Sequence, residues 1–148
     1  MGSANVDNRF EQPQGGSRDN PLVLDGTVKT STGTNLKTKI VTVPIGDVST
    51  SGSVFIVPGI AGTIVNFSNV IDAAITVADA GLTLEIDGVL VTGSAITITQ
   101  VGSAAGDVDQ ATPTALNTFT SLQSIEIVKD GLSTTASNGV VTLEILPA

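Results

Sequence analysis

The sequence predicts an all-β protein: an antiparallel β-sandwich or jelly-roll-like barrel of about eight to ten short strands, with an extended N-terminal arm. Three observations predict this class. Several segments alternate apolar and polar residues with the period of two that a half-buried strand requires. Turn signals such as Asp-Gly, Pro-Gly and Asn-Gly recur at intervals of roughly ten residues. No segment carries a helical apolar period over the length that a stable helix needs.

Residues 1–20 are expected to form the extended arm. Gly, Gln, Asn, Asp and Pro dominate this segment, and its large apolar residues after Met1 are Val6 and Phe10. Such a composition buries too little surface to offset the entropy lost on ordering. Residues 21–148 are expected to form a single β domain, with residues 21–39 as a possible transition from arm to strand.

The expected strands follow from apolar runs and alternation. In order, they are residues 22–24, 40–43, 54–57, 63–71, 82–86, 89–91, 96–98, 125–128 and 141–145. Residues 40–43 are all β-branched and are expected to stop at Pro44. Residues 82–86 alternate Leu or Ile with Thr or Glu, and the Asp87-Gly88 that follows predicts a hairpin. Residues 72–80 and 111–116 could each hold one turn, but neither predicts a helix.

The residue types that are missing argue against most catalytic and metal chemistry. The chain contains no His, Cys, Trp or Tyr. Without His and Cys it lacks the usual base at neutral pH, a thiol nucleophile and zinc–thiolate ligands. Without Trp and Tyr it lacks the common platforms on which sugars and bases stack. We therefore expect a protein that is not an enzyme and has no cofactor.

The net charge of −8 is unevenly distributed along the chain. Residues 1–39 hold five basic and four acidic residues, whereas residues 40–128 hold eight acidic residues and no Lys or Arg. Because such a body cannot neutralise phosphates, we expect neither nucleic acid nor an anionic membrane as a partner. No apolar run reaches the length of a membrane span, and residues 1–16 lack the apolar core of a secretory signal.

Two pairs of acidic residues are candidates for chemistry. Asp107 and Asp109, in the stretch GSAAGDVDQATPT at residues 102–114, could bind Ca²⁺, but no further acidic ligand follows at a suitable spacing. We expect a solvated, turn-forming loop without a metal, since Asp is favoured in such turns. Glu85 and Asp87 would lie on one strand face, as the paired carboxylates of glycosidases require. The alternating strand and the Asp-Gly turn explain both residues without catalysis.

From residue 54 onward the chain resembles a group of small β-rich virion proteins of tailed bacteriophages. The residues that carry the resemblance are VFIVPG (54–59), ADAGLTLEIDG (78–88), AAGDVDQATPT (104–114), SIEIVKDGLSTT (124–135) and VTLEI (141–145). Together they cover roughly residues 54–146. The sequence departs from the pattern within residues 117–124, where Leu122-Gln123-Ser124 replaces an expected Gly-Asp.

The resemblance implies a capsid decoration, or cement, protein. Such a protein is a structural component of the outer capsid surface, stabilises the capsid at junctions between major capsid proteins, and is commonly a homotrimer. The residues before 54 do not share the resemblance. The candidate contacts with the capsid or a neighbouring subunit lie there; they are Arg9, Phe10, Arg18, Leu22, Leu24, Lys37 and Lys39. The alternative is a head-fibre, tail-fibre or adhesin-type β module that binds a receptor on the host surface.

Overall fold

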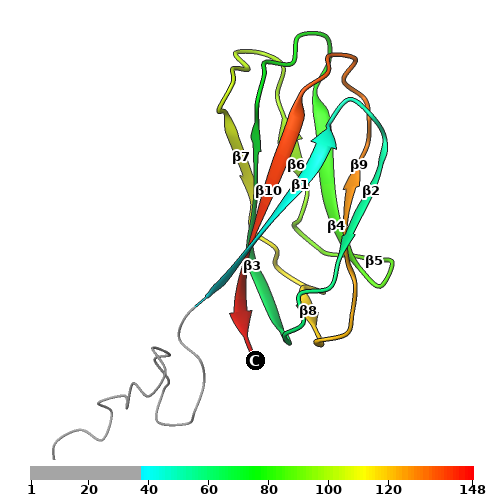
Figure 1. Cartoon of the computed structure of the whole chain (residues 1–148), viewed down its shortest axis with the longest axis vertical. Coiled ribbons are helices and arrows are strands. Elements are labelled where there is room, and N and C mark those ends of the chain that lie inside the picture. The colour runs from blue at the N-terminus through cyan, green and yellow to red at the C-terminus, as the bar shows by residue number, and fades with distance from the viewer. Residues whose placement is uncertain (1–37) are drawn as a thin grey trace, which may run out of the picture. The chain divides into compact units, whose positions relative to one another are not determined.

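The computed structural model describes residues 38–148, which form two antiparallel β-sheets packed face to face as a sandwich (Figure 1). The strands are β1 (Lys39–Asp47), β2 (Gly52–Ile56), β3 (Gly62–Ile71), β4 (Ala80–Ile86), β5 (Val89–Leu90), β6 (Ile96–Ile98), β7 (Val108–Ala111), β8 (Thr118–Phe119), β9 (Ile125–Lys129) and β10 (Asn138–Pro147). The predicted all-β sandwich is confirmed. The expected arm at residues 1–20 and the expected strand at residues 22–24 lie outside the described residues.

The strands pair in the order of a jelly roll. One sheet has the order β1-β10-β3-β7, with β8 also on β3, and the other has the order β2-β9-β4-β5, with β6 also on β4. β7 and β8 pair with different parts of β3, and β5 and β6 with different parts of β4, so each couple acts as one interrupted strand. Counted this way, the first strand pairs with the last, the second with the second-last, and so on inward, as in a double-sheet jelly roll.

The core lies between the sheets, where the alternation of the strands places it. β4 buries every second residue along its length, and β10 does so over most of its length. The largest fully buried side chains include Ile64, Phe67, Leu82, Leu84, Ile127, Leu143 and Ile145. Burying one such side chain contributes about 1.5–3 kcal/mol, so this apolar layer holds the two sheets against each other.

Two expectations about the strands are wrong. β1 continues through Pro44 to Asp47, because β1 is an edge strand, and an edge strand tolerates a residue without an N–H. β7 lies inside the stretch that was expected to be a loop. Its alternation is the reverse of the usual pattern, since Val108 is exposed while Asp109 pairs with the buried Asn69 and faces the interior. Because Asp109 occupies an inward position, residues 108–111 lack the apolar–polar alternation that predicts a strand.

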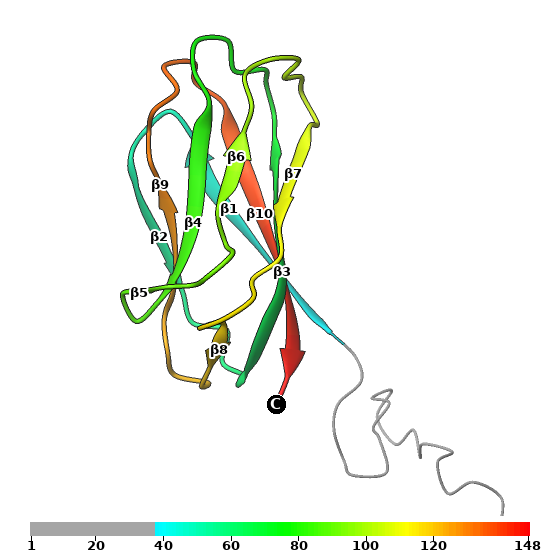
Figure 2. The same cartoon turned by 180° about the vertical axis from the view of Figure 1, so that it is seen from behind.

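The strand order gathers the connections at two ends of the sandwich (Figures 1 and 2). The connections at one end are residues 48–51, 72–79, 99–107 and 130–137. Those at the other end are residues 57–61, 87–88 and 120–124, together with the end of β10, and residues 112–117 lead from β7 to β8 alongside β3 toward this end. β1 begins near this second end, where Lys39 pairs with Ile145. No helix that could span a membrane occurs in residues 38–148.

Candidate functional site

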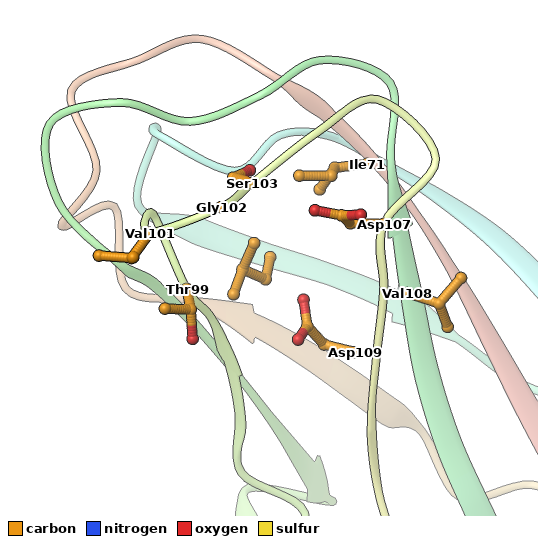
Figure 3. Close-up of a pocket in the computed structure, with 9 residues that line it drawn as sticks. Ile71, Thr99, Val101, Gly102, Ser103, Asp107, Val108 and Asp109 are labelled. Atoms are coloured by element: carbon orange, nitrogen blue, oxygen red, sulfur yellow. The ribbon is translucent and has the colours of Figure 1, made fainter.

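The stretch at residues 102–114 borders a cavity of about 190 Å³ (Figure 3). The buried side chains of Ile71 and Ile98 line it, and so do Asp107 and Asp109. The cavity is thus partly apolar and carries two carboxylates. It lies where the β6–β7 connection closes the gap between the edges of the two sheets.

Asp107 organises the turn that leads into β7. Its Oδ2 accepts a hydrogen bond from the backbone N–H of Ala104 at 2.6 Å, and its own N–H donates to the Ala104 carbonyl at 3.1 Å. The N–H of Gly106 donates to the Ile71 carbonyl at 2.8 Å, which ties this turn to the end of β3. The prediction of a turn-forming role is confirmed for Asp107.

Asp109 has a different environment. Burial, together with the negative charge of Asp107, raises the pKa of the Asp109 carboxyl. Two carboxylates on one cavity favour a positively charged group, such as a Lys or Arg side chain of a partner. Within residues 38–148, no group of three or more His, Cys, Asp or Glu residues is placed to hold a metal ion.

Glu85 and Asp87 do not form the pair that a glycosidase would need. Asp87 follows β4 in a left-handed conformation with φ of 48°, and it forms the hairpin turn together with Gly88. Its carboxylate accepts hydrogen bonds from Gln123 Nε2 at 3.0 Å and Ser124 N at 3.0 Å. The Gln123 side chain, followed by the Ser124 N–H, lowers the pKa of Asp87. Asp87 is therefore a structural link between two turns.

Glu85 instead lies opposite Glu126 of β9. On the same face of the sheet, Phe55 of β2 lies opposite Glu126, and Leu90 of β5 lies opposite Glu85. Both Phe55 and Leu90 are exposed. Like charges directly opposite each other destabilise a sheet. The outer face of this sheet thus carries two acidic residues between two exposed apolar residues.

One end of the sandwich is acidic. Its connections carry Asp72, Asp79, Asp107 and Asp130, and Asp47 at the end of β1 lies beside them. These five residues are termed the acidic end. Lys129 is the basic residue nearby. Its Nζ donates to the carbonyl oxygens of Ile45 and Asp47 at 2.8 and 2.9 Å, so the ammonium group is engaged by the edge strand β1.

Hydrogen bonds keep part of the acidic end ionised. Asp72 accepts hydrogen bonds from the Asn138 side chain and backbone N–H, both at 2.8 Å, and from Ser137 Oγ at 3.2 Å. The Asn138 side chain contributes most to lowering the pKa of Asp72. Asp47 accepts from the Ser49 N–H at 2.9 Å, and this bond lowers its pKa. The acidic end is therefore negatively charged at neutral pH.

The opposite end presents exposed apolar side chains. They are Val57, Val89, Leu90, Leu116, Leu122 and Leu146, and these residues are termed the apolar end. Leu122 is 87% exposed and Leu116 is 61% exposed. The charged side chain in the connections at this end is Asp87, whose carboxylate is already hydrogen-bonded. The acidic end also exposes Val77, Val101 and Leu132, so the two ends differ in charge and not in whether they expose apolar side chains.

Hydrogen bonds fix the turns of the apolar end. Leu122 lies in a turn closed by the Gln123 side chain, whose Oε1 accepts from the Thr120 N–H at 2.8 Å, and the same side chain donates to Asp87. The connection that carries Leu116 is held at both sides. The Thr92 N–H donates to the Ala115 carbonyl at 3.0 Å, and Asn117 Nδ2 donates to the Ile64 carbonyl at 2.8 Å.

Of the residues predicted to bind a partner, only Lys39 falls within the described part of the chain. It is exposed at the start of β1, near the apolar end. Arg9, Phe10, Arg18, Leu22, Leu24 and Lys37 lie outside the described residues. Sequence reasoning missed Leu116 and Leu122, because single Leu residues in polar connections carry no periodic signal.

The comparisons with known proteins add no family to this picture. No protein-family model matches the chain, and the comparison with curated proteins finds no relative. The resemblance to phage decoration proteins therefore stays an expectation that rests on the quoted motifs.

Proposed function

We propose that this protein is a structural virion protein that decorates the outer surface of a phage capsid and binds at junctions between major capsid proteins. The observation that carries this proposal is the unequal charge of the two ends of the domain: five Asp residues lie at the acidic end, whereas the connections of the apolar end carry Asp87 alone among charged residues. A protein that covers a shell needs one surface for the shell and another that remains in water. The apolar end suits the first role and the acidic end suits the second.

Two further observations support the proposal. The jelly roll is an architecture of viral capsid domains, although lectins also use it, so the fold alone does not decide the function. Of the carboxylates considered for catalysis, Glu85 lies opposite Glu126 of the neighbouring strand and Asp87 holds a turn. A decoration protein requires binding surfaces and a rigid frame, and no reaction.

We also propose that the protein acts as a homotrimer. The outer face of the β1-β10-β3-β7 sheet suits contact between copies that carry the same negative charge. Pro44, Val140, Val70 and Val108 form an uncharged row across its strands. The depletion of charge is typical of the centre of a protein interface. Molar mass by light scattering tests this; a monomer at the working concentration would refute it.

The N-terminal segment supplies a second proposed contact with the capsid. Extended segments bind by adding a strand or by wrapping around a partner, and apolar and basic side chains would anchor this one. The proposed anchors are Arg9, Phe10, Arg18, Leu22, Leu24, Lys37 and Lys39. Deleting residues 1–20 should weaken binding to the capsid, and undiminished binding would show that this segment is no anchor.

Binding of the full chain to undecorated phage heads tests the decoration proposal. The protein should sediment with the heads and saturate at a fixed number of copies per capsid, and imaging of the decorated heads should place it on the outer surface. Absence of binding would refute the proposal. Repeated strong signals on a glycan array, without head binding, would favour the receptor-binding fibre or adhesin module instead.

A further inference from the structure

We propose that the apolar end is the surface that docks onto the capsid shell, and that the shell presents basic residues beside it. This inference rests on the proposed decoration function. It adds which face of the domain binds and what chemistry the partner offers. The occupant is a shell protein whose contact surface is apolar at its centre and carries Lys or Arg at the margin next to Glu85 and Glu126.

The first support is that the exposed apolar side chains of the apolar end have little charge around them, whereas those of the acidic end, Val77, Val101 and Leu132, lie in connections that contain Asp. Scattered exposed Leu and Val residues are normal on a soluble protein, whereas a contiguous group marks an interaction surface. Hydrogen bonds join the segments that carry these exposed residues. Gln123, beside Leu122, reaches the Asp87 turn that precedes Val89. Thr92, two residues after Leu90, bonds to Ala115 beside Leu116.

The second support is that these side chains are presented on a fixed frame. A surface that is already ordered loses less conformational entropy on binding than a mobile one. Leu116 adds a specific sign of use. It has φ of 55°, a conformation that Gly or Asn adopts with less strain, and it nevertheless carries a large exposed side chain. Backbone strain of this kind is typical of binding sites.

The third support concerns the charge of the partner. The Glu85–Glu126 pair lies between Phe55 and Leu90, and Leu90 is itself part of the apolar end. The mutual repulsion of the two carboxylates would be relieved by a cation that the partner places against them. The pair therefore defines the margin at which a basic side chain fits.

The charge argument selects a different protein over a second copy. Within residues 38–148 the basic residues are Lys39 and Lys129, and the Lys129 ammonium already donates to two carbonyl groups of β1. The domain of a second copy thus has little positive charge to offer, and it brings ten acidic residues of its own. A shell protein with a basic margin fits the site better.

The test compares matched substitutions at the two ends, with undecorated phage heads as the probe. Leu122→Asp and Leu116→Asp alter the apolar end. Val101→Asp and Leu132→Asp are the controls, since these residues are 81% and 67% exposed in the connections of the acidic end and receive the same charge. All four are made in the full chain. Their melting temperatures, compared with wild type, verify that folding is retained.

We expect head binding to weaken about tenfold or more for the two variants of the apolar end, and by less than about twofold for the controls. The double variant Glu85→Gln/Glu126→Gln should also bind more weakly at low salt, with a smaller dependence on salt concentration. Equal losses at both ends, or unchanged binding of Leu122→Asp and Leu116→Asp, would overturn the docking surface.

The outcomes separate this inference from the decoration proposal. If wild type binds heads and the apolar-end variants bind equally well, the docking surface is wrong and decoration stands. If wild type does not bind heads, both are wrong. If Leu122→Asp changes the molar mass of the free protein but not head binding, the occupant is a second copy. If the Glu85→Gln/Glu126→Gln variant binds more tightly, the margin of the partner is acidic, contrary to the proposal.

Discussion

Replacing Ser94 with Ala should destabilise the domain, because this side chain bridges an interruption in one sheet. β5 pairs with Glu85 and Ile86 of β4, and β6 pairs with residues 80–82, so Leu84 lies between them. The Ser94 hydroxyl accepts a hydrogen bond from the Leu84 N–H at 3.0 Å and donates to the Val91 carbonyl at 2.8 Å. It thus takes the place of a missing strand residue.

The magnitude follows from the burial of the groups involved. Ser94 is 1% exposed and the Leu84 side chain is fully buried, so water has little access to the unpaired N–H. Leaving a buried donor without an acceptor costs about 1–3 kcal/mol. For a domain near 100 residues, each kcal/mol lowers the melting temperature by about 4–8 °C. We expect Ser94→Ala to melt about 5–15 °C below wild type.

Thermal melts followed by circular dichroism measure the effect. Urea unfolding measures it as well, and the dependence of the free energy of unfolding on urea concentration should be the same in the variant and in wild type. Ser53→Ala is the matched control, since Ser53 is exposed in the edge strand β2 and should tolerate the same change. Hydrogen exchange of the Leu84 amide should accelerate in Ser94→Ala alone. A variant as stable as wild type would refute the view that Ser94 replaces a strand hydrogen bond.

Three further changes test the charged and close-packed parts of the domain. The Asn138 side chain lowers the pKa of Asp72, so the stabilisation of the fold by the Asp72 carboxylate should be present above pH 4 and disappear as the pH falls through the folded pKa. Urea unfolding between pH 6 and 2 measures this. The same pH dependence in the Asp72→Asn variant would contradict it. The pKa of Asp109 is raised, so its charged form destabilises the fold at neutral pH. The Asp109→Asn variant should therefore melt at a higher temperature than wild type at pH 7 and lose this gain below about pH 3.8. A lower melting temperature at pH 7 would contradict the reasoning. Gly139→Ala would bring a Cβ to 2.7 Å from Asn69 Oδ1 and 2.9 Å from Ile45 Cδ1, and it should cost about 1–3 kcal/mol in calorimetry, whereas an unchanged melting temperature would show that both side chains move aside freely.

The fold was predictable where one side of a strand is apolar. Residues 82–86 and 141–145 alternate cleanly, and β4 and β10 bury the faces that this alternation predicts. The prediction was wrong where a single residue broke the rule. Pro44 suggested a strand end because a sequence does not reveal which strands lie at an edge. Asp109 concealed β7 because an inward carboxylate reverses the expected pattern.

The site was less predictable, because it depends on which connections meet in space. Asp107 and Asp87 were correctly interpreted as turn residues, since Asp has a known preference for turns. The pairing of Glu85 with Glu126 depends on the register of β4 on β9, and a sequence does not reveal which residues 41 positions apart lie opposite each other. For the same reason, the exposed Leu116 and Leu122 could not be assigned to one surface.

The antiparallel order nevertheless contains a sequence signal for the two ends. When β5 with β6 and β7 with β8 are each counted as one interrupted strand, successive strands run in opposite directions, so their connections alternate between the two ends of the sandwich. In this chain the connections at residues 72–79, 99–107 and 130–137 contain Asp as well as an exposed Val or Leu, whereas those at residues 57–61 and 120–124 contain an exposed Val or Leu and no charge. The described domain thereby has one strongly acidic end and one end with little charge. Exposed apolar side chains with little charge around them are typical of an interaction surface, and we therefore place the proposed docking surface at the second end.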